Sequence, residues 1–347
     1  MTAERTRCRG RTGFSLIEVL MAVFILALGL LGLGAVFPVV IREQRQGHDT
    51  VLGTTAAASA RALLQGYDYS TTLGNVRDMR DFWTRIRDDA SYGLRHPDYR
   101  HGEWLVAEAE SAGNVPGQIK LVGGGAQLTL RLANRLWPSP PPTPNQAPLF
   151  VWDFAVHRVV DGTNFYEGHG VRVAIFVRRL DPRIRVHPRE NLYRQLTDPN
   201  SEMRRVPVAV DEDGLPTYDG VGEPALHYAN LRKVRVEFRT ARPEDAARDR
   251  LYFDTSDPEG GNPQRNVPWR LARQVGQKLV DNLGNIYTVI EVGKANNGDE
   301  YVRVSPPVPA TVPPSADVSR NSDLPCIREV LLSPQIPAAV LLWRVVQ

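Results

Sequence analysis

The hydropathy pattern is dominated by a long apolar run near the N-terminus. From Phe14 to Ile41 the chain is almost continuously apolar, Glu18 is its only charged residue, and residues 19–41 carry no charge. As an α-helix these 23 uncharged residues would be about 35 Å long, at about 1.5 Å per residue. A hydrocarbon layer is about 30 Å thick, so the pattern predicts a membrane-spanning helix.

The helical pattern continues beyond this run with a narrower apolar face. Within residues 42–66, Leu52, Ala56, Ala60 and Leu63 form a single stripe at helical spacing. Gly66 is a suitable residue for the position that follows a helix end. The stripe predicts that this part of the helix packs on the rest of the protein.

Patterns typical of β-strands follow a second helical segment at residues 77–92, which carries Phe82, Trp83 and Ile86 on one side. The strand-like runs are residues 118–122, 127–132, 149–160, 170–180, 231–239, 278–281, 285–292, 301–305, 327–332 and 339–346. Proline-rich stretches at 137–148 and 306–314 separate some of them. We therefore expect a mainly antiparallel β body, as one sheet or as two subdomains divided near 137–148 or 195–225.

Composition and charge limit the class of protein to which the chain can belong. The chain has 347 residues, of which 42% are hydrophobic and 23% charged, as in ordinary globular proteins. The net charge of +3 equals that of residues 1–13, where four arginines outweigh Glu4. The remainder is neutral overall, so charge alone gives no reason to expect a nucleic-acid-binding body. A basic tip before an apolar run predicts a cytoplasmic N-terminus and an exported body.

Two simpler interpretations of the apolar run fit less well. A secretory signal peptide has an apolar region of about 7–15 residues that ends in small residues, whereas this run is longer and continues through residues 37–41. An uncleaved signal anchor fits the length but leaves Glu18 unexplained. An acidic side chain inside a membrane helix costs on the order of 2.5–3.5 kcal/mol and therefore needs a partner.

The residues around Glu18 offer a specific explanation. Residues 13–20 read GFSLIEVL after a short basic leader, and this segment resembles the N-terminus of type IV prepilins and type II secretion pseudopilins. The resemblance implies that prepilin peptidase cleaves between Gly13 and Phe14 and methylates the new amine of Phe14. It also implies that Glu18 pairs with the amine of a neighbouring subunit in a filament. The resemblance covers about residues 10–66.

Residues 25–33, ILALGLLGL, look like the GLLGL segment of PilV-type minor pilins, and I-type minor pseudopilins are similar. Gly29, Gly32 and Gly34 would allow neighbouring helices to approach closely. Together with Pro38 they also predict a weak turn of helix. The usual proline of the family would lie three residues earlier, where this chain has Ala35.

No catalytic motif stands out, and we expect neither an enzyme nor a cofactor. Gly-x-Ser-x-Gly, phosphate-loop and His-Glu-x-x-His patterns do not occur. His96 and His101 share a turn-rich stretch but would need further ligands to hold a metal. Acidic, glycine-containing stretches can bind calcium, but Asp and Gly also mark ordinary turns, which is the favoured interpretation. The acidic residues are Asp211, Asp213, Asp219 and Glu223 in one stretch and Asp254, Asp257 and Glu259 in the other.

The arginines give a weaker indication of DNA binding, and the cysteines bear on disulfide bonding. The arginines within residues 172–205 could form a face that binds DNA, but arginine is common throughout the chain and strand arginines often face water. Removal of the leader, with Cys8, would leave Cys326 as the only cysteine. The C-terminal disulfide that is common in major pilins could then not form.

These observations predict an α+β, type IV pilin-like fold in which a long N-terminal helix, membrane-spanning in its first half, packs on a large, mainly antiparallel β body. The predicted parts are a leader at 1–13, a helix at 14–66 that spans the membrane at 14–41, and a body at 67–347. The predicted role is that of a minor pilin or pseudopilin. Its partners would be prepilin peptidase, other pilins, the inner-membrane assembly platform and the lipid bilayer. The alternatives are an adhesin or DNA receptor on a pilin stem, and an exported protein on an uncleaved anchor.

Overall fold

A computed structural model describes residues 15–66, 78–88, 104–109, 119–123, 126–130, 132–138, 149–160, 168–179, 231–253, 271–295, 298–315, 326–333 and 335–345. The contacts divide the chain into two units, residues 1–50 and residues 51–347. Each unit is described by itself.

The long helix α1 (Leu16–Gln65) runs through both units and has 50 residues. It is continuous through Gly29, Gly32, Gly34 and Pro38, so the predicted weak turn is helical in this structure. The N–H of Gly66 donates a hydrogen bond of 2.8 Å to the carbonyl of Ala62, which confirms Gly66 as the residue after the helix end.

The part of α1 in the second unit packs on the body through small side chains. Ala56, Ala57, Ala60 and Leu64 are buried, while Leu52 and Leu63 are half-buried against the same core. The predicted stripe is therefore confirmed, and Ala57 and Leu64 widen it by two residues. Helix α2 (Met79–Asp88) contributes Met79, Phe82, Trp83 and Ile86 to this core.

A central antiparallel sheet lies beside these helices. Its long strands are β6 (Phe150–Val160), β7 (Gly168–Arg179) and β14 (Ala339–Val345), and β1 (Leu105–Val106) and β5 (Leu136–Trp137) pair with β6. The alternation along β7 assigns its two faces: Val173 and Ile175 join the core with the helices, and Ala174 and Phe176 join a second core on the other face. A smaller sheet of β2 (Glu108–Ala109), β3 (Ile119–Gly123) and β4 (Ala126–Leu130) and the short helix α3 (Leu132–Arg135) complete this part.

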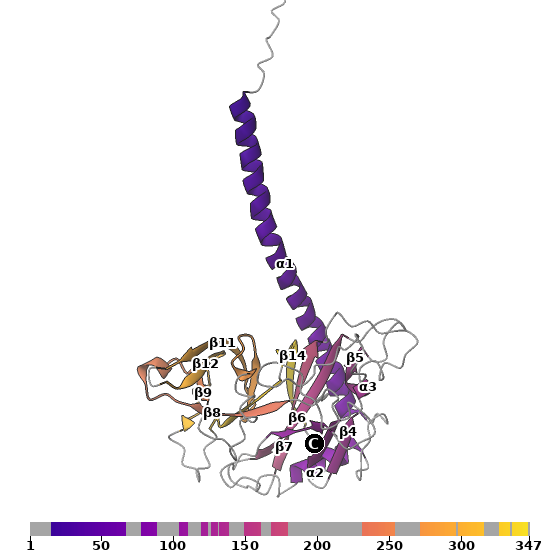
Figure 1. The fold of residues 1–347 in the computed structure, drawn as a ribbon. Coiled ribbons are helices and arrows are strands. Elements are labelled where there is room, and N and C mark those ends of the chain that lie inside the picture. The colour runs from indigo at the N-terminus through magenta and orange to yellow at the C-terminus, as the bar shows by residue number, and fades with distance from the viewer. Residues whose placement is uncertain are drawn as a thin grey trace, which may run out of the picture. The chain divides into compact units, whose positions relative to one another are not determined.

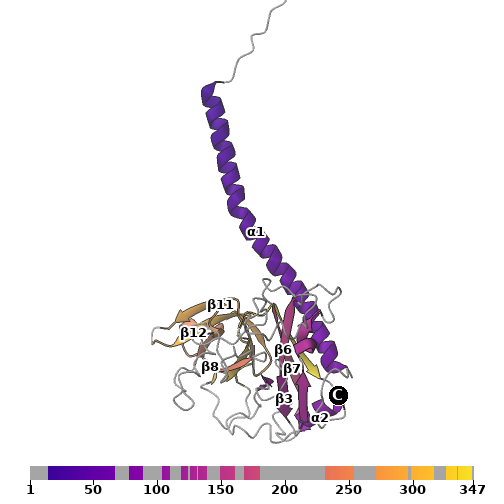
Figure 2. The same ribbon diagram turned by 45° about the vertical axis from the view of Figure 1, so that its right-hand side comes forward.

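A closed barrel of six strands lies on the second face of the central sheet (Figures 1 and 2). Its strands are β8 (Arg232–Phe238), β9 (Arg250–Phe253), β10 (Lys278–Asp281), β11 (Ile286–Lys294), β12 (Glu300–Ser305) and β13 (Glu329–Leu332), in the order β10-β11-β12-β9-β8-β13. Phe238, Leu279, Tyr287 and Val302 are fully buried in its own core. All six strands lie in the connection between β7 and β14, which are neighbours in the central sheet. The barrel is thus an insertion into that sheet.

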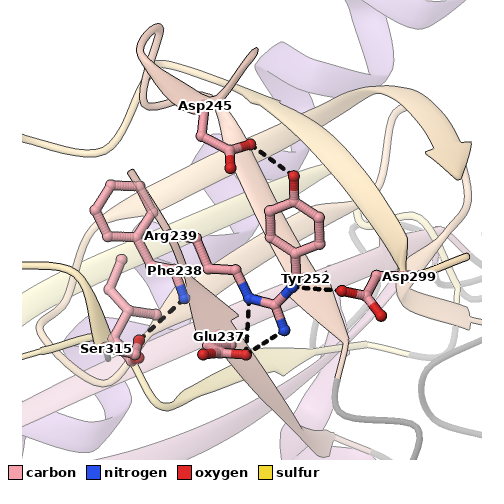
Figure 3. A network of polar contacts seen from close by, with 8 residues as sticks. Glu237, Phe238, Arg239, Asp245, Tyr252, Asp299 and Ser315 are labelled. Carbon is pink, nitrogen blue, oxygen red and sulfur yellow. Dashed lines mark hydrogen bonds and ion pairs between the residues drawn. The ribbon is translucent and has the colours of Figure 1, made fainter. Parts of the chain in front are cut away.

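Polar and aromatic side chains cross the outside of the barrel in a row. The strand register aligns Glu237, Tyr252, Tyr301 and Gly293 across β8, β9, β12 and β11. Figure 3 shows the guanidinium of Arg239 between Glu237 and Asp299, with the Tyr252 hydroxyl donating to Asp245 at 2.6 Å. Because the guanidinium also lies 4.7 Å from the centre of the Tyr252 ring, this network ties three strands of the barrel together.

Hydrogen bonds join the barrel to the central sheet. Trp104, just before β1, donates its indole N–H to the carbonyl of Asp281 at 3.1 Å and its backbone N–H to Glu329 at 2.9 Å. Arg172 of β7 donates to the carbonyl of Leu283 at 2.6 Å. Since these groups are buried or half-buried, their loss would leave unpaired polar atoms at the junction.

Most predicted elements are present, with bounds that differ from the predicted ones by a few residues. The pair at 149–160 and 170–180 forms β6 and β7, and the meander at 278–305 forms β10, β11 and β12. Strand β9 and the short strands β1, β2 and β5 were not predicted. The last predicted strand, β14, pairs with β7 at one end of the described sheet order.

Candidate functional site: the start of the long helix

Two side-chain contacts close the first turn of α1. Ser15 precedes the helix, and its hydroxyl oxygen accepts a hydrogen bond from the N–H of Ile17 at 3.3 Å. The carboxylate of Glu18 reaches back and accepts a hydrogen bond from the N–H of Ser15 at 3.0 Å. This is a variant of the capping box: Glu18 satisfies the backbone donor of the residue before the helix, and the Ser15 hydroxyl satisfies the free backbone donor of Ile17 in the first turn.

The capping box places a negative charge at the start of the helix. The N-terminus of a helix carries a partial positive charge, so a carboxylate there is favoured. The Glu18 carboxylate also points back along the chain, because its partner is the N–H of Ser15, the residue that follows Phe14. The sequence analysis missed this arrangement, although the pattern Ser-x-x-Glu before an apolar run is its usual signature.

The predicted cleavage residues Gly13 and Phe14 lie outside the described residues, as does the leader. Of the predicted site residues, the structure therefore describes Glu18, which is exposed at the helix start. Cleavage and methylation stay predictions.

The helix that begins at this site presents apolar side chains to its surroundings. Leu16 is 81% exposed, Phe24 60% and Leu31 75%, and other large apolar residues up to Ile41 are exposed as well. An ideal Cβ at Gly29, Gly32 or Gly34 would have no atom within 4 Å other than those of its chain neighbours and of the adjacent helix backbone. Continuous apolar exposure on this scale marks a surface that contacts another apolar phase or another protein.

A membrane span is not assigned by the described residues. In the part of the chain that the structure describes, no helix combines the length and hydropathy required to cross a bilayer.

The other candidates from the sequence do not form a site among the described residues. Within the ranges given above, no group of three or more His, Cys, Asp or Glu side chains could hold a metal ion. The predicted histidine pair and both acidic stretches lie outside these ranges. Cys326 is buried and has no disulfide partner.

The described arginines of the predicted DNA-binding face mostly point inward. Arg178 is fully buried and pairs with Asp153, which also pairs with the buried Arg135. Burial lowers the pKa of Arg178 to about 9. Arg172 is half-buried at the junction with the barrel, while Arg179 is exposed. The rest of this segment lies outside the described residues.

A comparison with protein families gives the decisive observation. A family model described as the prokaryotic N-terminal methylation motif matches residues 8–34. The chain carries a prepilin-type cleavage and methylation signal. A signal of this kind is typical of the precursors of type IV pilin-like proteins and pseudopilins. Neither the curated proteins nor the solved structures gave a match.

Proposed function

We propose that this protein is a minor pilin or pseudopilin, a subunit of a type IV pilus-like or type II secretion filament. Prepilin peptidase cleaves between Gly13 and Phe14, and the new amine of Phe14 is methylated. The observation that carries the proposal is the methylation motif on a helix whose start presents Glu18 and whose next turns present apolar side chains.

The mechanism is assembly through charge pairing in an apolar environment. Cleavage would create a cationic amine at Phe14, four residues before Glu18. An isolated carboxylate in a membrane helix costs on the order of 2.5–3.5 kcal/mol, and an isolated ammonium group costs a similar amount. Pairing Glu18 with the amine of a neighbouring subunit neutralises both groups, so the filament is favoured over separate subunits in lipid.

Before assembly the subunit would be held in the bacterial inner membrane by residues 14–41, with its N-terminus in the cytoplasm and its body exported. The support is the exposed apolar surface of α1 and the uncharged 23-residue segment that begins at Val19. In the filament the same surface would pack against other pilin helices. An exposed apolar helix serves both states because it requires an apolar environment in each.

The capping box gives Glu18 a second role before assembly. While its carboxylate accepts the N–H of Ser15, the charge lies at the helix start where the helix dipole favours it. Glutamine at the same position can also close a capping box but carries no charge. The two roles of Glu18 can therefore be separated by substitution.

The experiment compares Glu18→Gln with Glu18→Ala and Glu18→Leu in the native host, with filament incorporation and leader cleavage measured in parallel. We expect cleavage to persist in all three variants and incorporation to fall in all three, since none of them carries the charge. Normal incorporation of Glu18→Gln, with loss in Glu18→Ala, would mean that Glu18 acts as a helix cap only. Normal incorporation of all three would contradict the proposed role of Glu18.

A further inference from the structure

We draw no further inference here: the strongest candidate, the surface patch of exposed apolar side chains that Val275, Ile290 and Ile336 form on β11 and the loops before β10 and β14, is an unpartnered apolar face, and nothing in the structure shows what covers it.

Discussion

The guanidinium of Arg172 lies where a side chain at position 284 would begin. An ideal Cβ at Gly284 would be 2.6 Å from Cζ, Nε and Nη1 of Arg172, and Gly284 has a φ of +87°. Arg172 belongs to the central sheet and Gly284 to the turn between β10 and β11 of the barrel. Only glycine leaves room for the arginine to reach the carbonyl of Leu283 in that turn.

Gly284→Ala should therefore destabilise the protein more than its backbone angle explains. A left-handed backbone costs an L-residue roughly 1–2 kcal/mol, and displacing Arg172 removes a hydrogen bond worth about 1 kcal/mol. Gly298→Ala is the matched control, because Gly298 has a φ of +91° but only Lys294 Cε nearby, at 3.9 Å. Denaturant unfolding of the full chain in detergent should show the larger loss for Gly284→Ala. Equal losses would mean that Arg172 moves aside at no cost.

Arg248 is the described non-glycine residue with a positive φ, at 57°. Its guanidinium donates to the carbonyls of Val308 at 3.1 Å and Pro309 at 2.7 Å and lies over the ring of Phe238. Arg248→Lys should lower the free energy of unfolding by about 1–3 kcal/mol, because an ammonium group cannot replace the planar guanidinium that donates to both carbonyls.

The backbone of Arg248 gives a second comparison. Arg248→Gly and Arg248→Ala lose the same side-chain contacts, but glycine tolerates the positive φ. We expect the glycine variant to be more stable than the alanine variant by about 1 kcal/mol in urea unfolding. The reverse order would show that Arg248 imposes no strain on the backbone.

Tyr252 should titrate well above an ordinary tyrosine. Burial and its hydrogen bond to Asp245 raise its pKa to about 12. The folded pKa exceeds the unfolded value of about 10. The contribution of the neutral Tyr252 hydroxyl to the free energy of unfolding is therefore fully present below pH 10, and it is lost as the pH rises through about 12.

The difference in absorbance at 295 nm between the parent protein and Tyr252→Phe isolates this group. It should show one tyrosine that ionises near pH 12. A difference curve centred near pH 10 would show that the Tyr252 hydroxyl is not buried against Asp245.

The capping box predicts a measurable effect of Ser15 on the helix start. Ser15→Ala removes the acceptor for the Ile17 N–H, and such a loss costs about 1 kcal/mol; Ser15→Thr retains a hydroxyl. Hydrogen exchange in detergent micelles should be faster at Ile17 in Ser15→Ala and nearly unchanged in Ser15→Thr. Unchanged exchange in both variants would show that the cap is not formed in solution.

Much of the central sheet could be predicted because its signals are local. Residues 171–177 alternate between two apolar faces, and the long runs at β6 and β7 are close enough in sequence to suggest a pair. Asp153 and Arg178 interrupt the apolar pattern of these strands, and only the structure shows that they form an ion pair inside the core.

Closure of the barrel could not be predicted in the same way. It requires β12 to pair with β9 and β13 with β8, which are distant in sequence. Strand β9 has only four residues, and no turn pattern identifies its partner. At the candidate site the motif identified Glu18, whereas its hydrogen bond to Ser15 was not predicted, although the Ser-x-x-Glu pattern indicates it.

The most direct test of the account is the mass of the N-terminal peptide of the protein isolated from membranes of its native host. We predict that the mature chain begins at Phe14 with a methylated amine. A chain that begins at Met1, in cells whose prepilin peptidase is active, would contradict the account and leave the apolar helix as an uncleaved anchor.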